Sequence, residues 1–260
     1  MQNGNSTLRL HLVVFLSLGL LPHHISCQSS PLNPAPPPST LSQARQSFNP
    51  GSDIQSIHLV GSAVQQTGQA SQSGAMDFTL SAKGESTLTM SLSSGQWTEQ
   101  WDALNSGLGR NCTRTNPSGS YDMTIPACWL AVNWVFPHLS LQDATRSPLV
   151  TLSDGGTSSI DGTTYVTLKG ATAAQGASTR FQSLVNRWSP VTISLDPSTL
   201  QIASISYSQT PDSGAQIAIS TTIRYSDYRP VGSLMVPFHI ERAINGSTNL
   251  TLTITSVEAN

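Results

Sequence analysis

The sequence has few charged residues, and beyond its N-terminus it has no long apolar run. Asp, Glu, Lys and Arg make up only 10% of the 260 residues, and the formal net charge is −2. Lys and Arg occur singly, so the basic patch or stripe that binds nucleic acid is absent. After residue 21 no segment has the roughly 20 apolar residues that cross a bilayer. We therefore expect no nucleic-acid partner and no transmembrane segment in the mature chain.

The signatures of common enzymes and metal sites are also missing. The chain has no G-x-S-x-G, H-E-x-x-H or P-loop sequence. His58 and His239 alternate with apolar neighbours, which is typical of the polar face of strands. Asp154-Gly155 and Asp161-Gly162 lack the Asp-x-Asp pattern of a calcium loop and are interpreted as hairpin turns. We expect no cofactor, no metal and no enzymatic activity; a hydrolase whose residues meet only in the fold is the alternative.

The first 27 residues have the pattern of a signal peptide. Arg9 provides a positive charge, Leu10–Leu21 is apolar, and a short polar stretch follows. Cleavage after Cys27 would release a soluble protein that begins at Gln28. Cleavage before Cys27 would instead leave that cysteine as a lipidated N-terminus. Both alternatives predict an exported protein.

The remaining chain divides into a tether and one domain. Residues 28–40 are rich in proline, which favours an extended spacer without a core. Residues 41–260 are rich in Ser, Thr and Gly with enough apolar residues for a core, which indicates a single all-β domain. A short helix is predicted over 41–48, and alternating apolar residues predict strands over 76–80 and 88–92.

The C-terminal run from Ile217 to Asn260 predicts three successive strands joined by two tight turns. Gly232-Ser233 fits a two-residue hairpin with Gly in the first central position, and Asn245-Gly246 is the strongest short hairpin signal. The apolar residues between the turns alternate with polar ones, as strands with one buried face require.

This run resembles the C-terminal part of bacterial envelope proteins of the LolA/LolB-like superfamily, the outer-membrane lipoprotein-sorting type. The resemblance lies in Tyr225–Arg229, Leu234–Ile240 and Ile254–Asn260, and the stretch Val191–Leu200 resembles the middle of the same superfamily. It implies a mainly β fold, an incompletely closed antiparallel β-barrel (half-barrel) with short helices on its concave face. It also implies a periplasmic or outer-membrane location and a concavity that carries lipoprotein acyl chains.

The stretch Ile125–Phe136 predicts a helix that is apolar on nearly every side. Thr124 fits its N-cap, Pro126 its first turn, and Pro137 its end. Such a helix is either buried as core or faces a ligand. In the second case we expect the ligand to be lined by the aromatic residues Trp97, Trp101, Trp129, Trp134 and Phe136.

Three cysteines are present, and Cys27 is either removed or acylated. In an oxidising compartment, Cys112 and Cys128 are expected to form a disulfide. A metal site is the alternative, although two thiols without a nearby pair of histidines do not provide a typical ligand set.

The sequence thus favours an exported protein of the cell envelope that binds a lipid or a lipoprotein acyl chain in an apolar concavity. The alternative is a structural or interaction domain that has a filled barrel, no ligand and another envelope protein as its partner. A hydrolase with a dispersed site is the third hypothesis.

Overall fold

The structure is a computed structural model, and it describes residues 39–49, 51, 54–103, 111–124, 127–128, 138–139, 141, 150–160, 162–173, 177–209 and 218–260. All of these residues belong to one compact unit, Pro38–Asn260. The predicted signal peptide (residues 1–27, with Cys27) and nearly all of the predicted tether lie outside the described residues. Within them, no helix is long and apolar enough to cross a membrane.

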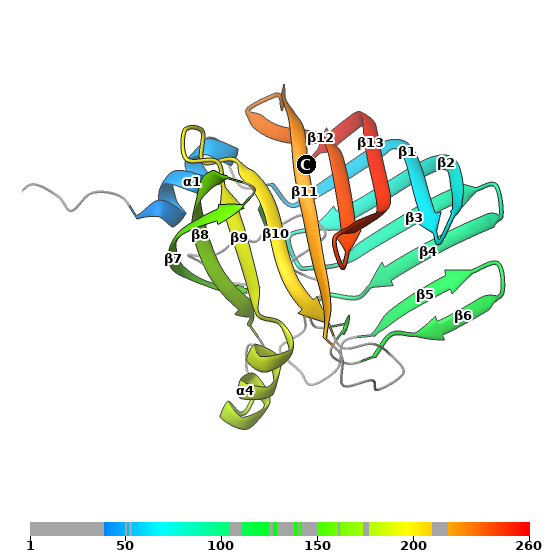
Figure 1. Ribbon diagram of the computed structural model, residues 1–260, viewed down its shortest axis with the longest axis horizontal. Helices are drawn as coiled ribbons and strands as arrows, with labels where there is room; N and C mark the ends of the chain where they lie inside the picture. Colours follow the sequence, from blue (N-terminus) through cyan, green and yellow to red (C-terminus); the bar gives the residue numbers. More distant parts are fainter. Residues whose placement is uncertain are drawn as a thin grey trace, which may run out of the picture. The chain divides into compact units, whose positions relative to one another are not determined.

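The described residues form one antiparallel sheet of 13 strands in the order β6-β5-β4-β3-β2-β1-β13-β12-β11-β10-β9-β8-β7 (Figure 1). The N-terminal wing consists of β1 (Ser56–Thr67), β2 (Ala70–Ser81), β3 (Ser86–Leu92), β4 (Gly95–Trp101), β5 (Cys112–Asn116) and β6 (Gly119–Asp122). The C-terminal wing consists of β7 (Val150–Ile160), β8 (Thr163–Thr172), β9 (Val191–Leu195), β10 (Ile202–Gln209), β11 (Ile219–Val231), β12 (Leu234–Ile244) and β13 (Ser247–Ala259). Strands β1 and β13 join the wings, and β6 and β7 are the two edges.

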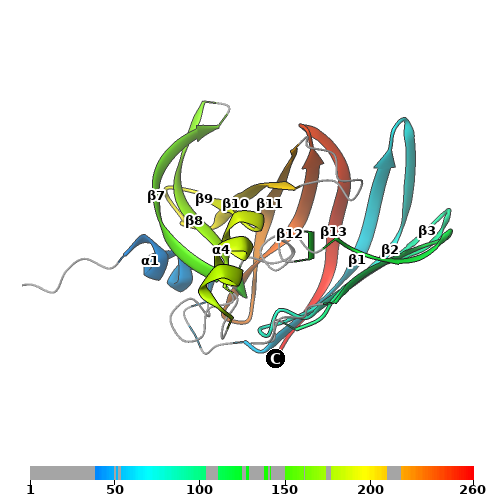
Figure 2. The same ribbon diagram turned by 90° about the horizontal axis from the view of Figure 1, so that it is seen from below.

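The sheet curls strongly without closing, as Figure 2 shows for the bend between its wings. Strands β4 and β12 are five places apart in the sheet, so in a flat sheet they would be about 24 Å apart. Yet Arg242 of β12 lies 3.8 Å from Glu99 of β4, measured between Nη1 and Oε2. The predicted mainly β, incompletely closed antiparallel fold is therefore confirmed.

The two C-terminal hairpins have the predicted turns. Gly232, with a φ of 60°, is followed by a residue with negative φ, the pattern of a type II′ turn. Asn245 and Gly246 both have positive φ, 48° and 81°, the pattern of a type I′ turn. These turn types match the twist of their strands and fix the register that buries one face.

The prediction of a hairpin turn at Asp154-Gly155 was wrong. These residues lie inside β7, where the register shifts because Asp154 pairs with Leu168 and Gly156 with Thr167. Gly155 is thus the extra residue of a β-bulge. A Cβ there would lie 2.7 Å from Oγ1 of Thr167, and Gly156 has a φ of 77°, so both glycines permit the bulge.

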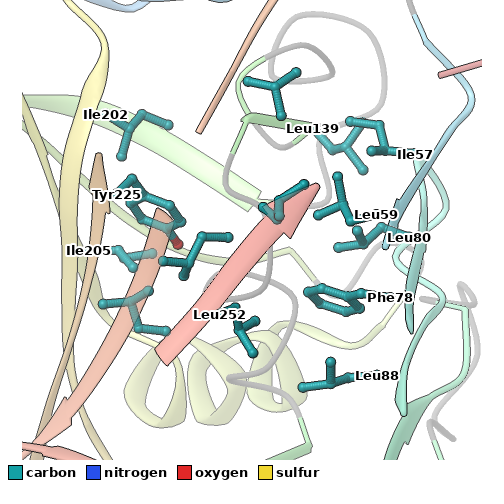
Figure 3. Packing of buried hydrophobic residues seen from close by; sticks show 14 of the residues in the cluster. Ile57, Leu59, Phe78, Leu80, Leu88, Leu139, Ile202, Ile205, Tyr225 and Leu252 are labelled. Atoms are coloured by element: carbon teal, nitrogen blue, oxygen red, sulfur yellow. The ribbon is translucent and has the colours of Figure 1, made fainter. Parts of the chain in front are cut away.

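One apolar core covers the inner face of both wings. Figure 3 shows side chains of the two wings pointing toward one another, among them Phe78 from β2 and Tyr225 from β11. Leu139, which lies between the strands in the sequence, is buried in the same cluster. Burying a large side chain of this kind stabilises the fold by roughly 1.5 to 3 kcal/mol. The strictly alternating strands, such as β2 and β3, were identified correctly from their sequence.

Two described helices pack on the sheet. Helix α1 (Thr40–Phe48) begins at its N-cap Ser39, and its buried residues Ala44 and Phe48 join the main core. It contacts β12 and β7, so it lies across the concave side. Helix α4 (Thr179–Trp188) packs on β8 through a separate small cluster around Val185.

Only part of the predicted helix Ile125–Phe136 can be assessed. Ala127 and Cys128 are helical, and so are His138, Leu139 and Leu141 farther along the chain. Residues 129–137 lie outside the described residues.

Candidate functional site

A cavity of about 210 Å³ lies at one end of the concave face. Both wings supply its wall, because strands β1 and β4–β6 meet strands β10–β13 there. The described lining residues are Gln65, Trp97, Glu99, Trp101, Arg114, Tyr121, Met123, Ala127, Tyr207, Thr221, Arg242, Ile244 and Asn249.

Strand alternation directs the charged lining residues inward. On β4, Glu99 lies between Trp97 and Trp101, and all three residues line the cavity. On β12, Arg242 follows the buried Ile240 by two positions, so the two side chains point to the same face of the sheet. Because side chains two apart in a strand share one face, these charged groups lie on the face that elsewhere forms the apolar core.

Glu99 is paired with two arginines. Its Oε1 lies 2.9 Å from Nε of Arg114, and its Oε2 lies 3.8 Å from Nη1 of Arg242. The Glu99 side chain is only 7% exposed, compared with 12% for Arg242 and 31% for Arg114. Burying a carboxylate without such cationic partners would cost several kcal/mol.

Polar neighbours surround the Glu99 carboxylate and its two arginines. Nε of Arg242 donates a hydrogen bond to Oδ1 of Asn249 on the adjacent strand β13, at 3.1 Å. Burial raises the pKa of Tyr207 far above its usual value, with a further increase from Glu99 and opposing effects of Arg242 and Arg114. Tyr207 therefore presents a neutral hydroxyl to the cavity region.

The predicted disulfide is present and borders the cavity. Cys112 and Cys128 are bonded, with their Cα atoms 5.5 Å apart. Cys112 pairs with Trp101 across strands β5 and β4, and its carbonyl accepts a hydrogen bond from Met123 N–H at 2.8 Å. The bridge thus fixes the segment that carries the lining residues Met123 and Ala127.

The structure places two of the five predicted ligand-lining residues, Trp97 and Trp101, at this cavity. Trp101 is almost fully buried in the core, while Trp97 is half-buried. The other three, Trp129, Trp134 and Phe136, lie outside the described residues.

Sequence reasoning missed the charged lining residues Glu99, Arg114 and Arg242. A signal was available for two of them, because Glu99 and Arg242 occupy inward positions of alternating strands. Arg114 lies on the short strand β5, whose five residues do not alternate clearly.

A second buried polar group lies near the other end of the core. His138 is 1% exposed, and its Nε2 lies 2.9 Å from the hydroxyl of Tyr228, which donates to the Ile202 carbonyl at 2.7 Å. Burial lowers the pKa of His138 to about 3. Aromatic rings of Phe48 and Tyr225 also contact His138. The neutral His138 side chain therefore packs between α1 and β11 and stabilises their contact.

The other histidine contacts are on the outer surface. His58 Nε2 lies 3.0 Å from Oδ2 of Asp77 and its Nδ1 lies 3.8 Å from Oε2 of Glu258. The hydrogen bond to Asp77 raises the pKa of His58. Among the described residues, no cluster of three or more His, Cys, Asp or Glu side chains could hold a metal ion.

No protein family profile matches the chain, and no curated protein matches it in sequence. Its fold is nevertheless similar to solved structures. An outer membrane lipoprotein-sorting protein domain from Vibrio parahaemolyticus has a TM-score of 0.52 at 8% identity, covering 85% of this chain and 91% of that domain.

Two further structures are similar over the same share of this chain. A DUF1329 family protein from Desulfovibrio piger has a TM-score of 0.51 at 8% identity, covering 85% of this chain and 90% of that one. A LolA superfamily protein from Nitrosomonas europaea has a TM-score of 0.49 at 14% identity, covering 85% and 92%. The chain therefore has the fold of the lipoprotein-sorting type, and the resemblance identified in the sequence is confirmed at the level of the fold.

Proposed function

We propose that the protein is an exported protein of the bacterial cell envelope that binds a lipid or a lipoprotein acyl chain in its concave face. The observation that carries this proposal is the cavity where the two wings meet. Its wall combines apolar side chains, among them Trp97 and Ile244, with a larger share of polar side chains such as Gln65, Thr221 and Asn249. Ligand sites in the mouths of β-barrels use apolar surface for affinity and polar groups to fix the orientation of the ligand, and this cavity offers both.

The size of the cavity limits what it holds. Ligand pockets typically have volumes of about 300 to 1,000 Å³, whereas this one has about 210 Å³. It therefore accommodates one end of an amphiphilic molecule rather than a whole lipid. Tyr121, which is 42% exposed, lies at its rim and leaves a path to solvent.

The fold supports an envelope location, in the periplasm or at the outer membrane, because it is shared with an outer membrane lipoprotein-sorting domain. We propose binding without catalysis. The described cavity wall contains no histidine or cysteine, and its carboxylate is held by two arginines, so it lacks a free general base.

A second candidate is a structural or protein-interaction domain. The continuous core favours it, because buried side chains of both wings fill most of the concave face in the described part of the chain. In that case the cavity would hold only water, and the partner would be another envelope protein.

Native mass spectrometry of the full chain, purified after export to a bacterial periplasm, separates these candidates. Organic extraction of the sample should release a lipid or an acylated peptide if the protein is a carrier. A protein that carries nothing and also fails to bind 11-(dansylamino)undecanoic acid would overturn the carrier proposal in favour of the interaction domain.

Trp97→Ala is expected to weaken binding of that dansyl probe by about tenfold, or about 1.4 kcal/mol. Trp97 is half-buried at the cavity and packs against the main core, so its removal takes away ligand contact and some core packing, which the two measurements below separate. Fluorescence titration gives the dissociation constant, and thermal unfolding gives the stability. Trp188→Ala, on α4 outside the main core, is the matched control and should leave probe binding unchanged. Equal effects of the two substitutions on binding would contradict the assignment of Trp97.

A further inference from the structure

We propose that helix α4 docks on the surface of an anionic lipid bilayer through Arg180, Leu184, Arg187 and Trp188. These four residues, the α4 patch, lie outside the cavity, so the inference goes beyond the proposed function. It adds an interaction surface and the kind of partner that this surface fits.

The apolar side of α4 is only partly covered. Phe181, Leu184, Val185 and Trp188 occupy positions i, i+3, i+4 and i+7, so they share one side of the helix. Val185 is fully buried, Phe181 and Trp188 are half-buried, and Leu184 is 38% exposed. A helix that used this side only to pack on its own sheet would bury Leu184 and Trp188 as well. Apolar surface is therefore left for an external partner.

Two arginines flank the exposed leucine. Arg180 precedes Leu184 by four residues and Arg187 follows it by three, so both are its neighbours on the helix surface. Both arginines are exposed, and neither forms an ion pair with another residue in the described part of the chain. Residues 177–195 contain no Asp or Glu. Exposed Leu and Trp beside arginines are typical of helices that lie in the interface of an anionic bilayer.

Hydrogen bonds fix which side of α4 faces outward. Nε2 of Gln182 donates to the carbonyl of Thr172, the last residue of β8, at 3.2 Å. Ser189 is fully buried at the end of the helix, and its Oγ accepts from Thr172 N–H and donates to the Val185 carbonyl, both at 2.8 Å. The helix therefore cannot rotate to bury the α4 patch without breaking these bonds.

The α4 patch lies at the end of the sheet that contains the cavity. Val191, the first residue of β9, follows Trp188 closely and pairs with Tyr207. Tyr207 pairs with Thr221 and Thr221 with Ile244, and all three of these residues line the cavity. Figure 1 shows α4 extending beyond the ends of β8 and β9. A bilayer bound by α4 would thus lie at the end of the molecule where the cavity is.

Co-sedimentation with lipid vesicles tests the inference. The protein comprises residues 28–260, which contain the whole compact unit Pro38–Asn260 and exclude Cys27, whose acylation would itself bind lipid. It should bind vesicles of phosphatidylglycerol and phosphatidylcholine about tenfold or more tightly than vesicles of phosphatidylcholine alone, and added salt should weaken this binding. Equal binding to the two kinds of vesicle, or binding to neither, would overturn the inference.

Substitutions in the α4 patch identify the surface that docks. The double variant Arg180→Gln/Arg187→Gln should bind anionic vesicles about thirtyfold more weakly, and Leu184→Ser about fivefold more weakly. These side chains are exposed, so thermal unfolding should be unaltered. If neither variant binds more weakly, α4 is not the docking surface and the inference is overturned. The comparison of the two kinds of vesicle remains decisive if a variant fails to fold.

Arg224→Gln is the matched control, because Arg224 is exposed on the outer face of β11. It should leave vesicle binding unchanged, whereas Arg180→Gln alone should weaken it by about fivefold. An equal loss in these two variants would show that overall charge rather than the α4 patch attracts the lipid, which would overturn the inference. Binding of 11-(dansylamino)undecanoic acid in solution should be the same in all variants. Failure to bind this probe overturns only the carrier proposal.

Discussion

Lowering the pH from 7 to 4 is expected to reduce the free energy of unfolding by about 3 kcal/mol through His138 alone. Burial lowers the pKa of His138 to about 3 in the folded protein, from an ordinary value of 6.5. Between these values the unfolded chain takes up a proton that the folded chain does not. Stability therefore falls as the pH decreases from 6.5 toward 3, by about 1.4 kcal/mol per pH unit.

Urea unfolding at pH 7, 5.5 and 4 measures this loss. His138→Gln should remove most of it, because glutamine has no titratable ring but can still donate to the hydroxyl of Tyr228. That donor is needed since the Tyr228 hydroxyl hydrogen is directed to the Ile202 carbonyl. An identical pH dependence for wild type and His138→Gln would refute the assignment to His138.

His58→Gln is the control for this experiment. The pKa of His58 is raised, so its contribution is present at low pH and is lost as the pH rises through that value. This sign is opposite to that of His138. The His58→Gln variant should thus retain the loss of stability in acid. The pKa values of Asp196 and Asp227 are lowered by hydrogen bonds. The stability that these groups provide is therefore present at neutral pH and is lost only as the pH falls below about 4.

The two buried polar groups lie at opposite ends of the same strands. On β11, Thr221 lines the charged cavity, and Tyr228 contacts His138 seven residues later, a distance of roughly 23 Å along a strand. The His138 group is neutral, hydrogen-bonded and packed against aromatic rings. The Glu99 group retains three formal charges and adjoins an open cavity. We therefore propose the Glu99 end of the sheet, rather than the His138 end, as the place for a ligand.

The left-handed backbone at Asp227 helps to build the neutral group. Strand β11 buries Tyr225 by simple alternation, which would point Asp227 inward next. With a φ of 55°, Asp227 instead lies exposed beside Arg229, and Tyr228 turns toward His138. Regular alternation along the strand would have placed Tyr228 on the outer face.

Elements specified by neighbours in the sequence could be predicted. The Asn245-Gly246 turn, the helix ending at Phe48 and the alternating strands β2 and β3 depend on local backbone and burial preferences. The Asp154-Gly155 prediction failed because the same dipeptide suits a bulge, and the choice depends on pairing with Thr167 on β8.

The candidate site could be predicted only in part because it depends on curvature. Trp97 and Trp101, which were predicted from their aromatic character, lie at the cavity. The contact between Glu99 and Arg242 joins residues 143 positions apart in the chain and five strands apart in the sheet. No local pattern encodes that approach. An inward charged residue in an alternating strand does indicate that a partner must exist, although it does not identify the partner.

Replacing Cys112 or Cys128 by Ser is expected to lower the free energy of unfolding in an oxidising buffer by about 3 kcal/mol. The bridge closes a loop with a sequence separation of 16, and opening it increases the conformational freedom of the unfolded chain. Urea unfolding of each single variant measures the loss. If both variants unfold like the wild type, the bridge does not form in solution.

The double variant Cys112→Ser/Cys128→Ser separates the bridge from the packing of each sulfur. Both cysteines are buried, so loss of packing alone would make the double variant less stable than either single variant. Loss of the bridge predicts that the double variant is no less stable than either single variant, and that reductant destabilises only the wild type.

Because the bridge also fixes the segment with Met123 and Ala127 at the cavity, all three variants should bind the dansyl acid more weakly than wild type. Unchanged binding alongside reduced stability would mean that the bridge stabilises the fold without shaping the cavity.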